Sequence, residues 1–355
     1  MSTAPNLIIK TGALGDVLRT TSILPGLREH HPDAPVVWLT AHGAVDLVRT
    51  HPLCDEVIGV NLTDDLAVWE SALAGRRFAR AFSLDDERNL CRLASGLDCE
   101  RLSGAFEGAD GTLAYTDDVA PWFDMGLLSR HGQQAADRLK ITNRESHPAL
   151  FARMLGITPG RSELVLPREA LDRAAAFAAE HRLEEPRPLI GLNTGAGGRW
   201  ESKQLTVETT VELAVRIGRA RGGRVVFLLL GGPEESERNR RLARELSAGE
   251  SPVRVVDTGC DNGLLDFAAL VDLCDLLVTS DSLALHMAVA RRVACVCFFA
   301  PTSAAEIELY GSGEKVVSTA ADVCSYRPDA DRSTLSAERI AAAVGRVLTA
   351  RGSLS

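Results

Sequence analysis

The chain has 355 residues, which exceeds what one hydrophobic core usually holds, so two domains are expected. A net charge of −9 and only 5% aromatic residues argue against a general nucleic-acid-binding protein, which would need a broad basic face. No stretch approaches the roughly 20 apolar residues of a membrane-spanning helix, and the N-terminus lacks a signal-peptide pattern, so we predict a cytoplasmic protein.

Apolar runs alternate with helix-period segments through the first half. Strands are predicted at 6–10, 36–40, 56–60 and 79–84, and helices over 16–30, 42–50 and 66–75. This alternation is typical of a parallel sheet covered by helices on both faces. Residues 99–145, rich in Gly, Asp and aromatic residues, are expected to be irregular and near an acceptor pocket. Helices are then expected over 146–155 and 168–182.

The charged, proline-containing segment 184–188 is expected to link two domains. A second alternation follows, with strands predicted at 188–193, 224–230, 253–257, 275–280 and 294–299, and helices over 206–221, 234–247, 264–272 and 283–290. Residues 301–303 are expected to begin another helix.

We therefore predict an α/β chain of two Rossmann-like, doubly wound parallel-sheet domains, 1–184 and 185–335, facing a central cleft. The last helix, within 336–355, is expected to pack back on the first domain. Ligands of such sheets bind at the C-terminal ends of the strands.

A glycine-bearing turn joins the first strand to the first helix. Thr11, Gly12 and Gly15 would let backbone amides approach an acceptor or a phosphate. Asp16 follows, and its carboxylate suits either a helix N-cap or a general base for an acceptor hydroxyl. An NAD(P)-dependent oxidoreductase is an alternative, but that class needs G-x-G-x-x-G, and the spacing here is G-x-x-G-D.

A second glycine-bearing loop begins the second half. Thr194, Gly195, Gly197 and Gly198 follow a strand and precede Lys203, a pattern that suits a diphosphate. The alternative is that Lys203 is a solvated loop residue. The loop is no Walker motif, because no G-K-[ST] occurs.

Three further residues follow the strand at 275–280. Asp281 and Ser282 lie where the strand ends, and His286 lies about one turn further along, so the three could share one helix face. A helix cap and a core histidine are the alternatives. Glu234 or Glu235, at the turn after 224–230, could accept from ribose hydroxyls, while most charges of the helix that follows should be exposed.

The eight cysteines are scattered and form no C-x-x-C pair, so neither a disulfide framework nor a zinc site is expected.

Together these segments resemble glycosyltransferase family 9, the ADP-heptose:lipopolysaccharide heptosyltransferases and their relatives. The resemblance covers nearly the whole chain and rests on the order of segments 7–40, 51–60, 193–205, 275–290 and 298–311. It implies a GT-B fold and an inverting, metal-independent transfer of heptose from ADP-heptose in lipopolysaccharide biosynthesis, without a cofactor.

The resemblance also implies residue roles. Asp16 falls on the family's catalytic base, and Lys203, with Thr194 nearby, on its donor-phosphate contact. Asp281, Ser282 and His286 fall on its donor-site helix. Leu283 stands where many members have glycine, which bears on the donor sugar.

The acceptor stays open between a saccharide, a lipid-linked saccharide and another hydroxyl compound, and a lipid-linked acceptor would bring peripheral contact with the inner membrane. Transfer of another nucleotide-activated sugar, and a catalytically silent transferase-like protein, are further alternatives.

Overall fold

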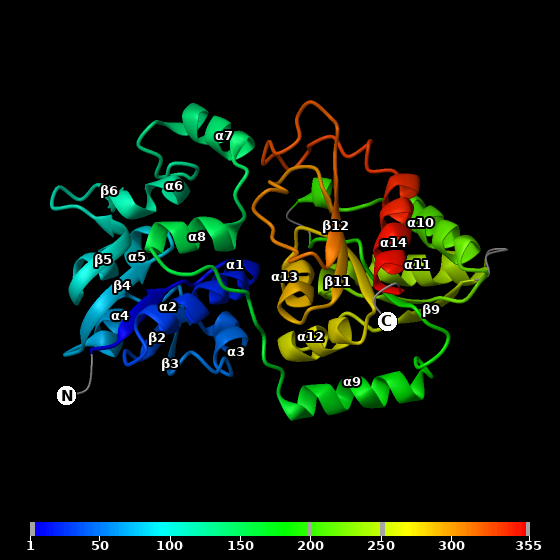
Figure 1. The fold of residues 1–355 in the computed structure, drawn as a ribbon, viewed down its shortest axis with the longest axis horizontal. Helices are drawn as coiled ribbons and strands as arrows, with labels where there is room; N and C mark the ends of the chain where they lie inside the picture. Colours follow the sequence, from blue (N-terminus) through cyan, green and yellow to red (C-terminus); the bar gives the residue numbers. More distant parts are fainter. Residues whose placement is uncertain (1–3, 198–199, 249–252, 353–355) are drawn as a thin grey trace. The chain divides into compact units, whose positions relative to one another are not determined.

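The computed structural model describes residues 4–197, 200–248 and 253–352. The chain divides into two compact units, unit 1 up to Val165 and unit 2 from Leu166 (Figure 1). Each unit contains one six-stranded sheet. The prediction of two α/β domains built on parallel sheets is therefore confirmed.

The sheet of unit 1 has the order β3-β2-β1-β4-β5-β6, and only β6 is antiparallel to its neighbour. Its strands are β1 Asn6–Ile9, β2 Val36–Ala41, β3 Glu56–Val60, β4 Arg77–Ser83, β5 Asp98–Glu107 and β6 Leu113–Tyr115. Its helices are α1 Leu14–Thr20, η1 Thr21–Ile23, α2 Leu24–His30, η2 His42–Ala44, α3 Val45–Val48, α4 Leu66–Leu73, α5 Arg88–Ser95, η3 Asp117–Val119, α6 Ala120–Phe123, α7 Gln133–Thr142 and α8 His147–Leu155.

Two expectations for unit 1 were wrong. The helix expected over 16–30 is divided into α1 and α2 by η1, because Pro25 near the start of α2 has no amide hydrogen for the helical ladder. The stretch expected to be irregular begins with β5, a strand of 10 residues that pairs with β4. Its charged residues masked the strand pattern, since most of them lie on exposed positions.

The sheet of unit 2 has the order β12-β11-β10-β7-β8-β9, and its pairs are all parallel. Its strands are β7 Leu189–Asn193, β8 Val226–Leu229, β9 Arg254–Asp257, β10 Leu276–Ser280, β11 Ala294–Phe299 and β12 Gly313–Val317. Its helices are α9 Arg168–Glu180, η4 Glu201–Lys203, α10 Val207–Ala220, η5 Pro233–Glu235, α11 Ser236–Ala248, α12 Leu264–Asp272, α13 Leu283–Ala290 and α14 Ala337–Gly352.

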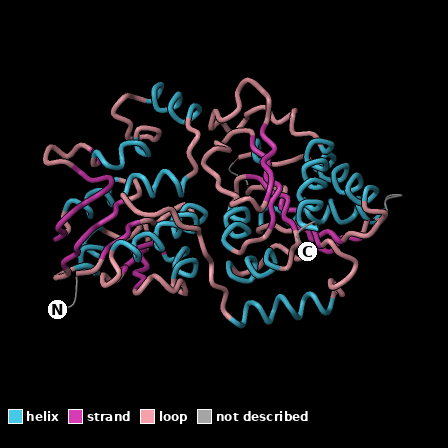
Figure 2. The backbone as a smooth tube through the Cα atoms, in the orientation of Figure 1, coloured by secondary structure: helices cyan, strands magenta, loops and turns pink. Residues whose placement is uncertain are grey.

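Residues 301–303 begin no helix, contrary to expectation, and β12 was not predicted. The segment 318–336 between β12 and α14 consists of loops and turns (Figure 2).

The helix α9 belongs to unit 2, so the boundary expected after residue 184 was placed too late. Phe177 packs against the core formed by β7, β8 and α12, and Arg173 forms an ion pair with Asp266 of α12. Figure 1 shows α9 beside α12. The sequence break at 184–188 therefore separates α9 from β7 within one unit.

The C-terminal helix α14 also packs within unit 2, which corrects the expectation that it covers the first domain. Its buried stripe of Ile340, Ala343, Val344 and Val347 has the spacing of one helix face. This stripe joins the core formed with α10, β11 and β12.

Both sheets have the same strand order. When the strands of each unit are numbered 1 to 6 along the chain, that order is 3-2-1-4-5-6. The order reverses between β1 and β4 in unit 1, and between β7 and β10 in unit 2. In open α/β sheets, ligands bind at such reversal points, beyond the carboxyl ends of the strands. These two points are therefore the expected ligand-binding positions of the two sheets.

The helices within the described ranges are all too short or too polar to cross a membrane.

Candidate functional site

In unit 2, Lys203 and Asp281 meet at the reversal point. Lys203 ends η4, and its Nζ lies 3.2 Å from Oδ2 of Asp281 and 2.9 Å from the Asp281 carbonyl oxygen. His286, on α13, places Nε2 3.6 Å from the other carboxylate oxygen of Asp281. The sequence predicted these three residues as site residues, and the structure brings them together.

Ser282 occupies the N-cap position of α13, but its side chain accepts no capping hydrogen bond. Its hydroxyl instead lies 3.0 Å from Thr279 Oγ1 and 3.3 Å from Asn193 Nδ2. Asn193 ends β7 and Thr279 lies in β10, so these contacts fix Ser282 to the two strands that flank the reversal point. The capping alternative does not hold for the Ser282 side chain.

Thr194, the first residue after β7, turns its hydroxyl into unit 2 and is 2% exposed. Its Oγ1 accepts a hydrogen bond of 2.8 Å from Arg238 Nη2 and lies 3.2 Å from Thr210 Oγ1. Arg238 was not predicted, because most charges of its helix were expected to be exposed. Gly198 lies outside the described residues.

Glu235 joins two glycine-bearing loops. Its Oε1 accepts from the Gly197 amide at 2.7 Å, and its Oε2 accepts from the Gly232 amide at 2.8 Å. A Cβ on Gly195 would lie 2.3 Å from Glu235 Cγ, so only glycine allows this approach without a shift. Both carboxylate oxygens of the predicted ribose contact are thus engaged by backbone amides.

The segment that carries Lys203 is held by the loop 318–336. Ser202 donates from its amide to the Pro328 carbonyl and from its hydroxyl to the Arg327 carbonyl, both at 3.0 Å. Arg332 donates to the Gln204 carbonyl at 3.1 Å. Sequence reasoning did not identify this loop, because backbone carbonyls leave no signature in residue types.

In unit 1, the reversal point is occupied by Lys10, Thr11 and Asp85. Asp85 follows β4 and accepts from the Thr11 amide and, at 2.8 Å, from the Thr11 hydroxyl. It also forms an ion pair with Lys10. Burial opposes the charge of Lys10, but the carboxylates of Asp85 and Asp16 outweigh this effect and raise the pKa of Lys10. Asp85 was not predicted, although its place at a strand end was a usable signal.

Asp16 is the third residue of α1, whose N-cap is Ala13, so the N-cap alternative is wrong. Its Oδ1 lies 2.9 Å from Arg19 Nε, and its side chain remains 35% exposed. The Arg19 guanidinium in turn stacks over Trp122, 5.4 Å from the ring centroid. Asp16 is thus a half-exposed carboxylate held in the first turn of a helix.

The two glycines of this turn differ. Space is open around the Cβ position of Gly12, whereas Gly15 is buried within α1.

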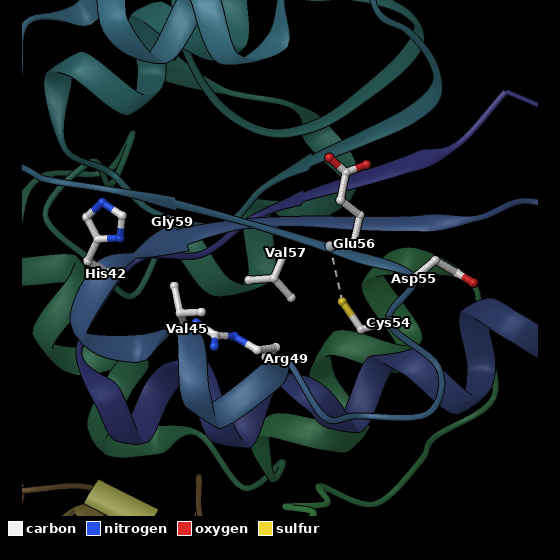
Figure 3. Close-up of a pocket in the computed structure, with 8 residues that line it drawn as sticks. All are labelled: His42, Val45, Arg49, Cys54, Asp55, Glu56, Val57 and Gly59. Atoms are coloured by element: carbon white, nitrogen blue, oxygen red, sulfur yellow. Dashed lines mark hydrogen bonds between the residues drawn. The ribbon is translucent and has the colours of Figure 1, made fainter. Parts of the chain in front are cut away.

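A separate hollow of about 410 Å³ lies between α3 and the edge strand β3 (Figure 3). It contains none of the predicted site residues. Its carboxylates have other partners, since Asp55 pairs with Arg28 and Glu56 with Arg76. Burial raises the pKa of the Cys54 thiol to about 11, so this cysteine is no ready nucleophile. We assign the activity elsewhere.

Within the described ranges, no three His, Cys, Asp or Glu side chains form a group that could hold a metal ion. The eight cysteines are all free thiols.

The model of glycosyltransferase family 9 (heptosyltransferase) matches residues 129–333. No curated protein matches the chain.

Several solved structures share the fold. A glycosyl transferase family 9 protein from Veillonella parvula DSM 2008 has a TM-score of 0.74 at 19% identity, over 98% of each chain. The E. coli ADP-heptose LPS heptosyltransferase II has a TM-score of 0.66 at 16% identity, over 98% of this chain and 99% of that one. E. coli heptosyltransferase WaaC, in a structure with ADP-2-deoxy-2-fluoro heptose, has a TM-score of 0.60 at 18% identity, over 96% and 99%. The GT-B fold class expected from the sequence is confirmed by these likenesses.

Proposed function

Because the chain belongs to glycosyltransferase family 9 and is therefore a glycosyltransferase, we propose that it transfers heptose from ADP-heptose to an acceptor hydroxyl. The observation that carries this proposal is the group Lys203, Asp281 and His286 at the reversal point of unit 2, within the matched residues. An ADP-heptose analogue bound to WaaC supports the choice of donor.

In this proposal, unit 2 binds the donor. Lys203 and the first turn of α13 offset the negative charge that grows on the diphosphate as it leaves. These groups take the place that a metal ion has in other transferases, so we propose that no metal ion is needed. Asp281 positions Lys203, since it accepts from the ammonium group.

Unit 1 supplies the base. The acceptor oxygen forms a bond to the anomeric carbon while the bond from that carbon to the diphosphate oxygen breaks. The acceptor proton passes to Asp16, and a nucleoside diphosphate leaves. One such displacement inverts the anomeric carbon. The partial exposure of Asp16 leaves its carboxylate accessible to an acceptor.

A donor screen tests the proposal. The purified chain is incubated with ADP-heptose and with ADP-, UDP- and GDP-hexoses, each with and without EDTA, and a lipid A–inner core saccharide is the first acceptor. We expect release of ADP from ADP-heptose that depends on acceptor and resists EDTA. Release of nucleoside diphosphate from another nucleotide sugar alone would show that this other sugar is the donor. Such a difference in donor specificity would be attributed first to Leu283, which follows Ser282 at the start of α13. Loss of activity in EDTA would contradict the metal-independent mechanism.

A further inference from the structure

Arg238 lies in the first turn of α11, among the residues of the proposed donor site, and differs from the other arginines nearby. Arg240 pairs with Glu237 at 3.2 Å, and Arg241 pairs with Glu245 at 2.7 Å. Within the part of the chain that the structure describes, no carboxylate forms an ion pair with Arg238. Its positive charge is therefore not balanced by direct contact.

Neutral groups hold the guanidinium in place. Its Nη2 donates to Thr194 Oγ1 at 2.8 Å and to Thr210 Oγ1 at 3.0 Å. These hydroxyls belong to the residue after β7 and to α10, so the contacts tie α11 to the glycine-bearing loop that begins at Thr194. One turn earlier, Glu235 holds the same loop through Gly197.

The other two nitrogens of the guanidinium donate to no described residue. Nε is buried, and no described residue accepts from it. Nη1 likewise has no acceptor among the described residues, and it is not one of the buried groups. Burial lowers the pKa of Arg238 to about 10, although the nearby charge of Glu235 favours the cation. A buried donor without an acceptor, such as Nε, carries a desolvation cost, whereas Nη1 is open to solvent and so to a ligand.

A phosphate is the acceptor that this arrangement suits. A guanidinium presents several donors in a fixed plane and forms its strongest hydrogen bonds with anionic oxygens. Lys203, the predicted phosphate contact, already has the Asp281 carboxylate as a partner. Arg238 has no carboxylate partner among the described residues. The geometry points to Arg238 as a second cationic residue of the donor site, which donates from Nη1 to a phosphate oxygen of the nucleoside diphosphate. This inference rests on the proposed function, because it assumes a nucleotide-sugar donor.

Calorimetric titration with ADP and with adenosine tests the inference. The variants are R238M, R238K and R238Q, and R240M is the matched control, since it removes an exposed guanidinium from the same helix. Far-ultraviolet circular dichroism and thermal unfolding establish that each variant folds. If R238M does not fold, R238Q decides, because its amide can still donate to a hydroxyl but carries no charge.

We expect R238M and R238Q to bind ADP about 10- to 100-fold more weakly than the wild type, because each variant loses one hydrogen bond to a charged group. The adenosine affinity of these variants should stay within about twofold of the wild-type value. The ADP affinity of R238K should lie between those of the wild type and R238M, and R240M should bind ADP as the wild type does. Unchanged ADP affinity in R238M or R238Q, or equal losses of affinity for ADP and adenosine, would overturn the role of Arg238. Neither result would contradict the proposed function. A wild-type chain that binds no ADP would contradict both the proposed function and this inference.

Discussion

Lys203 and Asp281 are joined by two contacts at the carboxyl edge of the sheet of unit 2. The Lys203 ammonium lies 3.2 Å from a carboxylate oxygen of Asp281 and 2.9 Å from its carbonyl oxygen. Each side chain is 19% exposed, so both remain within reach of a ligand. A bound diphosphate would share the ammonium with Asp281, which holds Lys203 in one place beforehand. Such preorganisation lowers the entropy lost on binding.

Lys203→Met should therefore weaken binding of ADP far more than binding of adenosine. One charge-assisted hydrogen bond is lost, so we expect about 10- to 100-fold for ADP and little change for adenosine. Calorimetric titration of both ligands measures this, and Lys140→Met on α7 of unit 1 controls for the loss of one positive charge. Equal losses for the two ligands would show that Lys203 supports the loop without contacting phosphate.

Gly195 and Glu235 should be energetically coupled. A Cβ at residue 195 would overlap Glu235 Cγ at 2.3 Å, so Gly195→Ala forces a shift that costs about 1–3 kcal/mol of unfolding free energy. In a Glu235→Ala background that overlap is absent, and Gly195→Ala should cost little. Urea unfolding of the two single variants and the double variant gives the coupling free energy. Additive effects would mean that the loop at Gly195 relaxes away from Glu235.

The central strands were predictable because parallel strands buried on both faces are continuous apolar runs. β7 and β10 are such runs, and the polar residues directly after them, Thr194 and Asp281, were recognisable as candidates for a reversal-point site. β5 and β12 were missed, since their residues are largely polar or only partly buried.

What the sequence did not reveal depends on long-range pairing. Asp85 is one of many acids at strand ends, and its role follows only from the placement of β4 beside β1. Arg238 belongs to a helix with several other charged residues, and nothing in that pattern tells which arginine faces the loop. For α14, the apolar stripe predicted a buried face but not which sheet it would cover.

Asp118 should give unit 1 an acid-dependent part of its stability. Burial opposes ionisation of Asp118, but hydrogen bonds from Thr116, Ser103 and Arg101 outweigh it and lower the pKa. A lowered pKa stabilises the fold above the ordinary value near 3.8, and this contribution is lost as pH falls through the lowered value. Asp118→Asn should therefore cost about 1–3 kcal/mol at pH 7.

The difference between wild type and Asp118→Asn should narrow below about pH 4. Urea unfolding from pH 7 to pH 3 measures it, with tryptophan fluorescence as the signal. A difference that stays constant over this range would assign the loss to packing, not to the charge of Asp118.

The assignment of Asp16 as the base has a closely matched control within unit 1. Asp16 lies in the first turn of α1 and pairs with Arg19 three residues on, at 2.9 Å. Asp46 lies in the first turn of α3 and pairs with Arg49 three residues on, at 3.5 Å. Both carboxylates pair with an arginine three residues on in the first turn of a helix, so Asp46→Asn controls for the loss of such an ion pair.

Only Asp16→Asn should remove most transfer activity, because asparagine cannot take the proton of the attacking hydroxyl. We expect kcat to fall about 10²- to 10⁴-fold with unchanged ADP affinity, and Asp46→Asn to keep wild-type turnover. Release of ADP under saturating donor and acceptor measures both variants. Turnover near the wild-type rate in Asp16→Asn would exclude it as the base. An equal fall of kcat in Asp16→Asn and Asp46→Asn would contradict this role, because the two substitutions share only the loss of an ion pair in the first turn of a helix.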